Sequence, residues 1–219
     1  MKLQVLILLL AICLSTAACS ALPVGGGGGA DPALPANVLF QDDFSDPSSG
    51  WDRINQPEGI TDYEDGAYRI FVNTINTDIW ANPGLDFGDV RLEVEATKVG
   101  GNDNNDFGVI CRYQDPDNYY FFILSSDGYY GIGKVKDGVQ TLIGVDAMPP
   151  SEAIIQGDAT NRLRVDCIGP LLSLYANDEF LDQYEDTDFS SGDVGLIAGT
   201  SPEAPGTDIL FDNFQVLKP

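Results

Sequence analysis

The chain has 219 residues, of which 43% are hydrophobic, enough for one sizeable core but short for two full domains. Its 34 acidic and 11 basic residues give a formal net charge of −23, which disfavours nucleic acid and anionic lipid as partners. Because the sequence contains no histidine, it excludes a Ser-His-Asp triad, a Cys-His pair and histidine-ligated zinc or iron. Any catalysis would depend on carboxylates, tyrosines or lysines.

The N-terminal segment has the form of an export signal. Lys2 precedes the apolar run "LQVLILLLAICL" and the small residues "STAAC", a pattern typical of a secretory signal peptide and too short for a membrane span. The small residues end at Cys19 and resemble a bacterial lipobox, in which removal of residues 1–18 leaves the cysteine as a lipidated N-terminus. The pattern departs at Thr16, where a lipobox usually has Leu, and the alternative is ordinary cleavage near Ala18.

Residues 19–37 are predicted to form a flexible linker. The stretch contains five consecutive glycines and three prolines, with too little apolar content to repay the entropy of ordering. We therefore expect an exported, cell-surface bacterial lipoprotein, whose folded domain, residues 38–219, contacts the membrane only through the N-terminal lipid.

From Val38 onward, short apolar runs alternate with Gly, Pro, Asn and Asp, and no long helical period is present. Segments such as "DVRLEVEATKV" and "NRLRVDCIG" alternate apolar and polar residues, as half-buried strands do. Asp127-Gly128 and Asp137-Gly138 lie between strand-like runs and predict hairpin turns. The fold class predicted from these patterns is all-β, a two-sheet antiparallel β-sandwich.

The alternation places Cys111 and Cys167 on core faces of their strands. In an oxidising compartment they can form a disulfide if the two strands are neighbours or face each other across the sandwich. The alternative is two buried free thiols that pack as small hydrophobes.

The hairpin through "DPD" decides which side chains point inward. If Tyr113 pairs with Tyr119, the odd-numbered residues share the core face, and Arg112, Tyr120 and Phe122 share the second face. A two-residue turn at Asp127-Gly128 would place the glycines of "YYGIGK" beside this second face. A three-residue turn would instead place Tyr130 and Lys134 there.

The strings "DFGVICRYQDPDNYYFFILSSDGYYGIGKVKDG", "LFQDDFSDPSSGW" and "ILFDNFQV" resemble the concanavalin A-like (laminin-G-like, jelly-roll) domains of bacterial surface lipoproteins, which are related to the 3-keto-disaccharide hydrolase domain family. The resemblance spans roughly residues 38–218. It implies two antiparallel sheets, one bent to give a concave face where sugars often bind, on a fold that hosts lectins, glycosidases and inert spacers.

Sugar binding needs an exposed aromatic face surrounded by planar hydrogen-bonding groups. The candidate ligand-binding residues are Trp80, Arg112, Tyr120, Phe122, Tyr129 and Tyr130, and the expected partner is a glycan. The alternative is that a loop covers this face and the aromatic residues are ordinary packing.

Calcium is a second candidate ligand, as a structural cofactor. "QDDFSD" and "FDNF" resemble the positions where jelly rolls of this superfamily hold calcium, which would bring Asp43 and Asp212 together. Such a site needs six to eight oxygens. "GGNDNNDFG" is a rival acidic loop.

No catalytic residue is predicted, because the sequence lacks the Glu-x-Asp-x-Glu string of laminarinase-type jelly rolls, and "LEVEA" and "YEDTD" do not fit it. The leading hypothesis is a membrane-anchored extracellular module that binds carbohydrate on a concave aromatic face. The alternatives are an enzyme of the glycoside hydrolase or 3-keto-disaccharide hydrolase type, and a non-catalytic structural or adhesion module. The residues name neither the sugar nor the oligomeric state.

Overall fold

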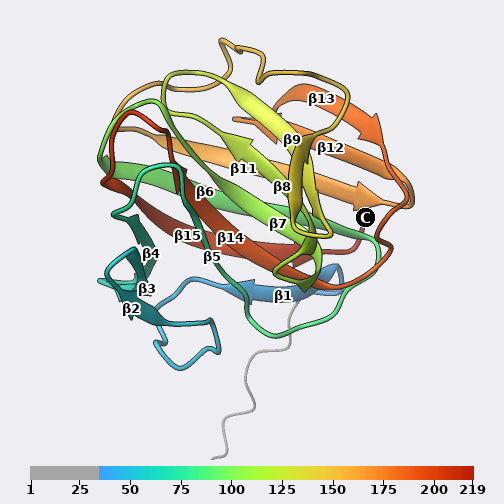
Figure 1. Ribbon diagram of the computed structural model, residues 1–219. Coiled ribbons are helices and arrows are strands. Elements are labelled where there is room, and N and C mark those ends of the chain that lie inside the picture. The colour runs from blue at the N-terminus through green and yellow to red at the C-terminus, as the bar shows by residue number, and fades with distance from the viewer. Residues whose placement is uncertain (1–34) are drawn as a thin grey trace, which may run out of the picture. The chain divides into compact units, whose positions relative to one another are not determined.

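The computed structural model describes residues 35–219. The predicted signal peptide, the lipidated Cys19 and almost all of the linker lie outside the described residues. Strands β1 to β15 form two antiparallel sheets stacked as two layers (Figure 1). This confirms the predicted all-β sandwich. Within residues 35–219, no helix is long and apolar enough to cross a membrane.

The larger sheet has nine strands in the order β13-β12-β11-β6-β15-β4-β3-β2, with β1 also paired to β15. Its members are β1 (Val38–Asp42), β2 (Ile54–Gln56), β3 (Gly59–Glu64), β4 (Ala67–Val72), β6 (Val90–Gly100), β11 (Thr160–Ile168), β12 (Leu171–Ala176), β13 (Glu179–Glu185) and β15 (Thr207–Leu217).

The smaller sheet has six strands in the order β10-β9-β8-β7-β14-β5. Its members are β5 (Asp78–Ala81), β7 (Asn105–Asp115), β8 (Asn118–Leu124), β9 (Tyr130–Lys136), β10 (Val139–Leu142) and β14 (Asp193–Thr200). Asp137-Gly138 forms the two-residue turn between β9 and β10, with both residues at positive φ, as the sequence predicts.

The main core lies between the two sheets. Alternate residues of most strands point into it, among them the fully buried side chains of Tyr68, Leu92, Phe107 and Phe211. Cys111 of β7 and Cys167 of β11 form a disulfide, which ties the six-stranded sheet to the nine-stranded one.

The predicted register of β7 with β8 is wrong. Cys111 pairs with Tyr120, and Val109 pairs with Phe122, so the even-numbered residues of β8 point into the core. The cause is an irregularity after Cys111, where residues 112–114 of β7 face Tyr119 alone and Arg112 has a φ of 53°. An odd shift of register moves every side chain of the strand to the other face.

The register of β8 with β9 places Tyr130 opposite Leu124 and Lys134 opposite Tyr120. Tyr130 and Lys134 therefore share a face with Tyr120, as expected for the three-residue turn, although Asp127-Gly128 lies in a longer loop, residues 125–129. The glycines of "YYGIGK" lie on the outer face. A Cβ on Gly133 would overlap the ring of Phe121, so the glycine is required by close packing.

Candidate functional site

Four of the predicted ligand-binding residues line the main core or its edge. The exposed fraction of the side chain is 2% for Arg112, 0% for Tyr120, 0% for Phe122 and 9% for Tyr130. The prediction that they form an open ligand-binding face is therefore wrong, because the register of β8 turns this face toward the nine-stranded sheet.

The polar side chains among these four residues form hydrogen bonds and an ion pair within the protein. Arg112 Nη1 donates to the carbonyl oxygens of Gly169 and Phe189, each at 2.9 Å, and Nη2 forms an ion pair with Asp89 at 3.1 Å. The hydroxyl of Tyr120 donates to Asp186 at 2.6 Å. These bonds hold the segment after β13 against the six-stranded sheet.

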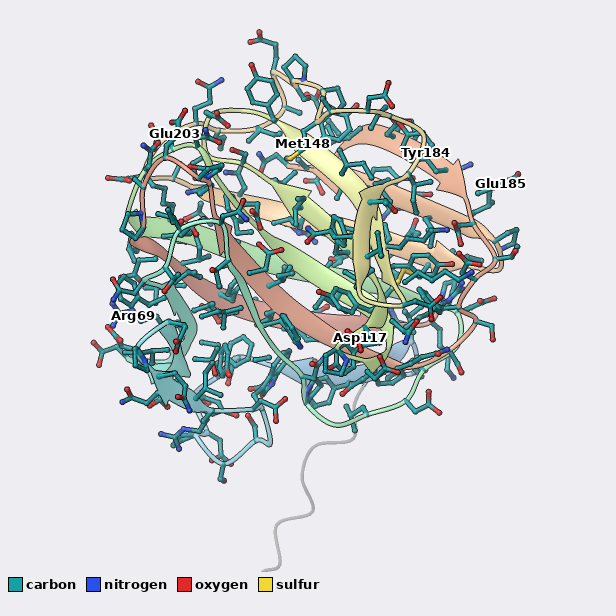
Figure 2. All side chains as sticks on the ribbon, in the orientation of Figure 1. Arg69, Asp117, Met148, Tyr184, Glu185 and Glu203 are labelled. Atoms are coloured by element: carbon teal, nitrogen blue, oxygen red, sulfur yellow. A yellow bond between two sulfur atoms is a disulfide. The ribbon has the colours of Figure 1, made fainter. Side chains whose placement is uncertain are left out.

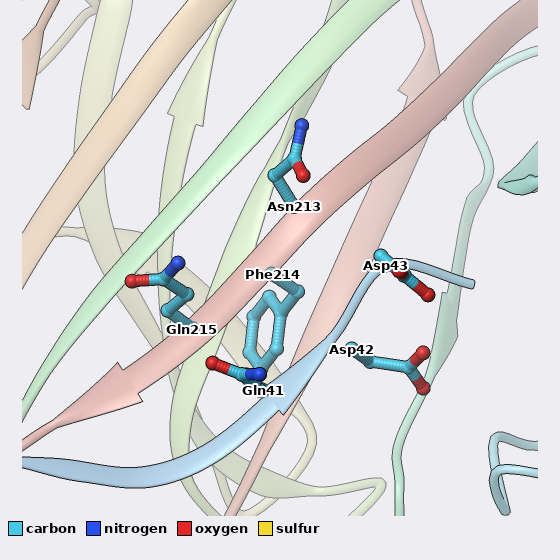
Figure 3. A pocket seen from close by; sticks show the side chains of 6 residues that line it. All are labelled: Gln41, Asp42, Asp43, Asn213, Phe214 and Gln215. Carbon is cyan, nitrogen blue, oxygen red and sulfur yellow. The ribbon is translucent and has the colours of Figure 1, made fainter. Parts of the chain in front are cut away.

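A polar pocket of about 320 Å³ lies where β1 meets β15 (Figure 3). Asp43 lines it together with Gln41, Asn213 and Gln215, but Asp212 does not. The carboxylate of Asp43 already accepts hydrogen bonds from the main chain and hydroxyl of Ser45, at 3.1 and 2.6 Å. Among residues 35–219, no group of three or more acidic or cysteine side chains is placed to hold a metal ion. Calcium at this position stays a prediction.

The outer face of the six-stranded sheet carries a second hydrophobic cluster. Its buried members are Ile110, Tyr119, Phe121, Ile123, Val135 and Ile197, and the partly buried residues packed against them are Trp80, Tyr113, Leu142 and Met148. The central strands of this sheet are thus apolar on both faces. This explains why β8 is a continuous apolar run whose sequence does not distinguish inside from outside.

Three aromatic rings from three strands meet on this outer face. The ring centroid of Tyr119 lies 5.7 Å from that of Trp80 and 5.6 Å from that of Tyr113. Tyr119 is 3% exposed, whereas Trp80 and Tyr113 are half-buried. Trp80 is therefore the predicted ligand residue that the structure places at an accessible aromatic surface. We refer to Trp80, Tyr113 and Tyr119 as the aromatic row.

Beside the aromatic row, Asp78 and Asp106 form a carboxylate pair. Gly199 of β14 pairs with Asp78 on β5 and with Asp106 on β7, so the two side chains flank the glycine. Both carboxylates lie within 2.6 Å of the position that a Cβ would take on Gly199. Their nearest oxygens are therefore at most about 5 Å apart, so the two carboxylates are close neighbours. Only a glycine leaves room for this approach.

The surroundings of the carboxylate pair favour a bound proton. Burial raises the pKa of Asp106 well above its ordinary value, and the charge of Asp78 raises it further. Burial also raises the pKa of Asp78, while a polar contact with Gln140 lowers it. No cation is among the groups that act on either carboxylate in the described residues. The pair titrates as a unit, with Asp106 in the better position to hold the proton.

Tyr129, the remaining predicted ligand residue, is 40% exposed and lines two cavities. One, of about 290 Å³, is also lined by Asn104, Asn105 and Met148, but not by Asp106. Met148 belongs to the segment that packs against β9 on the outer face (Figure 2). The other cavity, of about 220 Å³, is lined by Pro150 and Glu152.

Asp78 and Asp106 were not predicted from the sequence. Alternation in "DIWA" places Asp78 on the face of Trp80, and alternation in "NDFGVI" places Asp106 on the face of Ile110. Each segment therefore shows only one of the two carboxylates. Their meeting depends on the strand order β5-β14-β7, which no local pattern specifies.

No protein-family model and no reference protein sequence matches this chain. The fold, in contrast, matches many solved structures. The chain is similar to the carbohydrate binding module CBM66 from Bacillus subtilis, with a TM-score of 0.63 and 18% identity over 77% of this chain and 96% of that chain.

Two glucanases have the same architecture. The Bacillus licheniformis beta-glucanase matches with a TM-score of 0.59 and 8% identity over 82% of this chain and 98% of that one. The catalytic domain of an endo-1,3-beta-glucanase (laminarinase) from Thermotoga petrophila matches with a TM-score of 0.58 and 9% identity over 83% and 97%. At these identities the likeness shows the fold alone, which is a two-sheet jelly-roll sandwich.

Proposed function

We propose that this protein binds carbohydrate on the outer face of its six-stranded sheet. The observation that carries the proposal is the aromatic row beside the carboxylate pair. The half-buried rings of Trp80 and Tyr113 offer apolar surface to the C–H groups of a pyranose, and the carboxylates of Asp78 and Asp106 can accept hydrogen bonds from its hydroxyls. Solved structures of the same fold include proteins described as a carbohydrate binding module and as glucanases, which supports this class of ligand.

The test is calorimetric titration of the full chain with a panel of soluble oligosaccharides, with Trp80→Ala as the site variant. We expect Trp80→Ala to weaken binding about tenfold, which corresponds to the loss of ~1.4 kcal/mol of stacking and apolar contact. The matched control is Phe180→Ala on β13, an exposed aromatic (56%) of the other sheet, which should leave the affinity unchanged. Absence of binding across the panel would overturn the proposal.

A second candidate function, glycoside hydrolysis, is favoured by one specific observation. Two neighbouring carboxylates, one of them with a pKa raised by burial, are the kind of pair that a retaining mechanism uses, and that mechanism needs a separation of about 5 Å between them. In that mechanism Asp106 would protonate the glycosidic oxygen as the bond to the anomeric carbon breaks. Asp78 would form a covalent bond to that carbon, and water activated by Asp106 would then release the sugar and restore both carboxyl groups.

Binding and hydrolysis are separated by Asp106→Asn. The amide keeps the shape of the side chain and can still form hydrogen bonds, but it cannot transfer a proton to the glycosidic oxygen as a general acid. If the protein is an enzyme, wild type releases reducing ends from a bound oligosaccharide, and Asp106→Asn retains the ligand while this release stops. If wild type binds without releasing reducing ends, the enzymatic candidate is rejected and the binding function stands.

The predicted export and lipid anchor belong to the same proposal. We propose that Cys19 carries the lipid and presents the sandwich on the cell surface. Radiolabelled fatty acid should be incorporated into the full chain in a bacterial host and lost in Cys19→Ala. Equal incorporation into both would refute the anchor without affecting the carbohydrate site.

A further inference from the structure

The surroundings of Tyr129 bear on which carbohydrate is bound. The side chain is 40% exposed, and it lines a cavity together with Asn104, Asn105 and Met148. This cavity and the cavity lined by Pro150 share two lining residues, Asp127 and Tyr129. Tyr129 therefore lies at the boundary between two cavities.

Each cavity is small enough to hold only one ring of a larger ligand. Their volumes of about 290 and 220 Å³ are below the range of roughly 300–1,000 Å³ that holds a whole drug-sized molecule. A chain of small rings can place one ring in each cavity, with an aromatic side chain between them for stacking. The first cavity is also lined by Asn104 and by Asn105, the first residue of β7, the strand that carries Asp106, so a longer chain could extend from this cavity toward that strand.

The charge of this region restricts the chemistry of those rings. The two cavities are lined by the carboxylates of Asp127 and Glu152 and by no lysine or arginine of the described residues. Asp78 and Asp106 flank Gly199 in the same sheet and add further acidic groups, and the whole chain has a net charge of −23. Sulfated or uronic acid sugars would meet like charge with no cation to compensate it.

We propose that the ligand is a linear, uncharged oligosaccharide, held along its length by the carboxylate pair, by the cavity lined by Asn104 and Asn105, and by the cavity lined by Pro150 and Glu152. This inference rests on the proposed carbohydrate-binding function and adds the length, linearity and charge of the ligand. Tyr129 is the stacking residue between the two cavities.

The experiment is calorimetric titration of the full chain with uncharged linear glucan and xylan oligosaccharides, from the disaccharide to the hexasaccharide, and with uronic acid oligosaccharides of matched length. We expect affinity to rise with chain length and then level off. Tyr129→Ala should weaken binding of the hexasaccharide by roughly three- to tenfold and leave the disaccharide unchanged. Tyr129→Phe should retain the wild-type affinity, and Phe180→Ala serves as the exposed-aromatic control.

The outcomes separate this inference from the function on which it rests. If no sugar of any length binds, the carbohydrate-binding function itself is rejected. If disaccharide and hexasaccharide bind equally well, or if Tyr129→Ala affects neither, binding stands and the extended site is rejected. Tighter binding of the uronic acid series would overturn the charge argument. Unchanged thermal unfolding of Tyr129→Ala would show that any loss of affinity is local.

Discussion

The carboxylate pair exists because position 199 has no side chain, and Gly199→Ala tests this directly. The oxygens of Asp106 lie 2.6 Å from the position of the new Cβ, and one oxygen of Asp78 approaches it more closely. Ordinary van der Waals contact begins at 3.4 Å. The carboxylate of Asp106 must therefore retreat by roughly 0.8 Å, and that of Asp78 by more.

Two effects are expected from this displacement. Stability should fall by about 1–2 kcal/mol, at the lower end for overpacking, because the displaced atoms are the ends of side chains rather than backbone. The pKa of Asp106 should move down toward its ordinary value, because the carboxylates separate and the burial that raises the pKa is relieved. Urea unfolding measures the first effect, and carboxyl carbon chemical shifts followed against pH measure the second.

A second glycine-to-alanine variant is a matched control, for which the expected change in stability is opposite. Gly88 is not at positive φ and a Cβ there would meet nothing within 4 Å, so Gly88→Ala should stabilise the protein by roughly 0.4–1 kcal/mol through the unfolded state. When Asp78 and Asp106 are both replaced by alanine, Gly199→Ala should lower the free energy of unfolding much less than it does in the wild-type protein. Equal stability of the two alanine variants, with no coupling in this cycle, would refute the close approach of the carboxylates to Gly199.

Three further predictions concern the scaffold and its pH dependence. Reduction of the Cys111–Cys167 disulfide, which spans 56 residues, should lower the free energy of unfolding by about 4 kcal/mol; equal urea midpoints of the oxidised and reduced protein would contradict this. Arg112→Met should lower the free energy of unfolding by about 3–5 kcal/mol, because the carbonyls and the carboxylate that Arg112 binds lose a buried partner. Arg53→Met, which removes a half-exposed ion pair, is the control and should change the free energy of unfolding by less than about 0.5 kcal/mol. Thermal or urea unfolding measures both. Because the pKa of Asp106 is raised in the folded state, the folded protein holds this proton more tightly, and stability falls as the pH rises from about 4 through the raised pKa. Asp106→Asn should therefore be more stable than wild type at pH 7 and no more stable at pH 3, and a gain of equal size at both pH values would contradict this explanation.

Much of the fold follows from local patterns. The alternation in "DVRLEVEATKV" and "NRLRVDCIG" predicted two strands that the structure contains, β6 and β11, and it placed Cys167 on a core face. These predictions succeed because β6 and β11 each have one mainly apolar and one mainly polar face, so burial selects the register.

The candidate site could not be predicted in the same way. The six-stranded sheet is apolar on both faces, so the sequence of β8 permits either orientation, and the irregularity beside Arg112 decides between them. Asp78 and Asp106 are two of 34 acidic residues, separated in the sequence and joined only through Gly199. Only the strand order brings the three positions together.

The position of β15 has a consequence for how the chain is made. This strand pairs with β6 along one edge and with β4 and β1 along the other, so it joins the two halves of the nine-stranded sheet. Until residues 207–217 have left the ribosome, β6 and β4 remain open edges that cannot close on each other. The nine-stranded sheet therefore cannot close before residues 207–217 are made, and the many contacts between distant segments make its folding slow. Late closure would suit the proposed export, because an export channel threads an unfolded polypeptide.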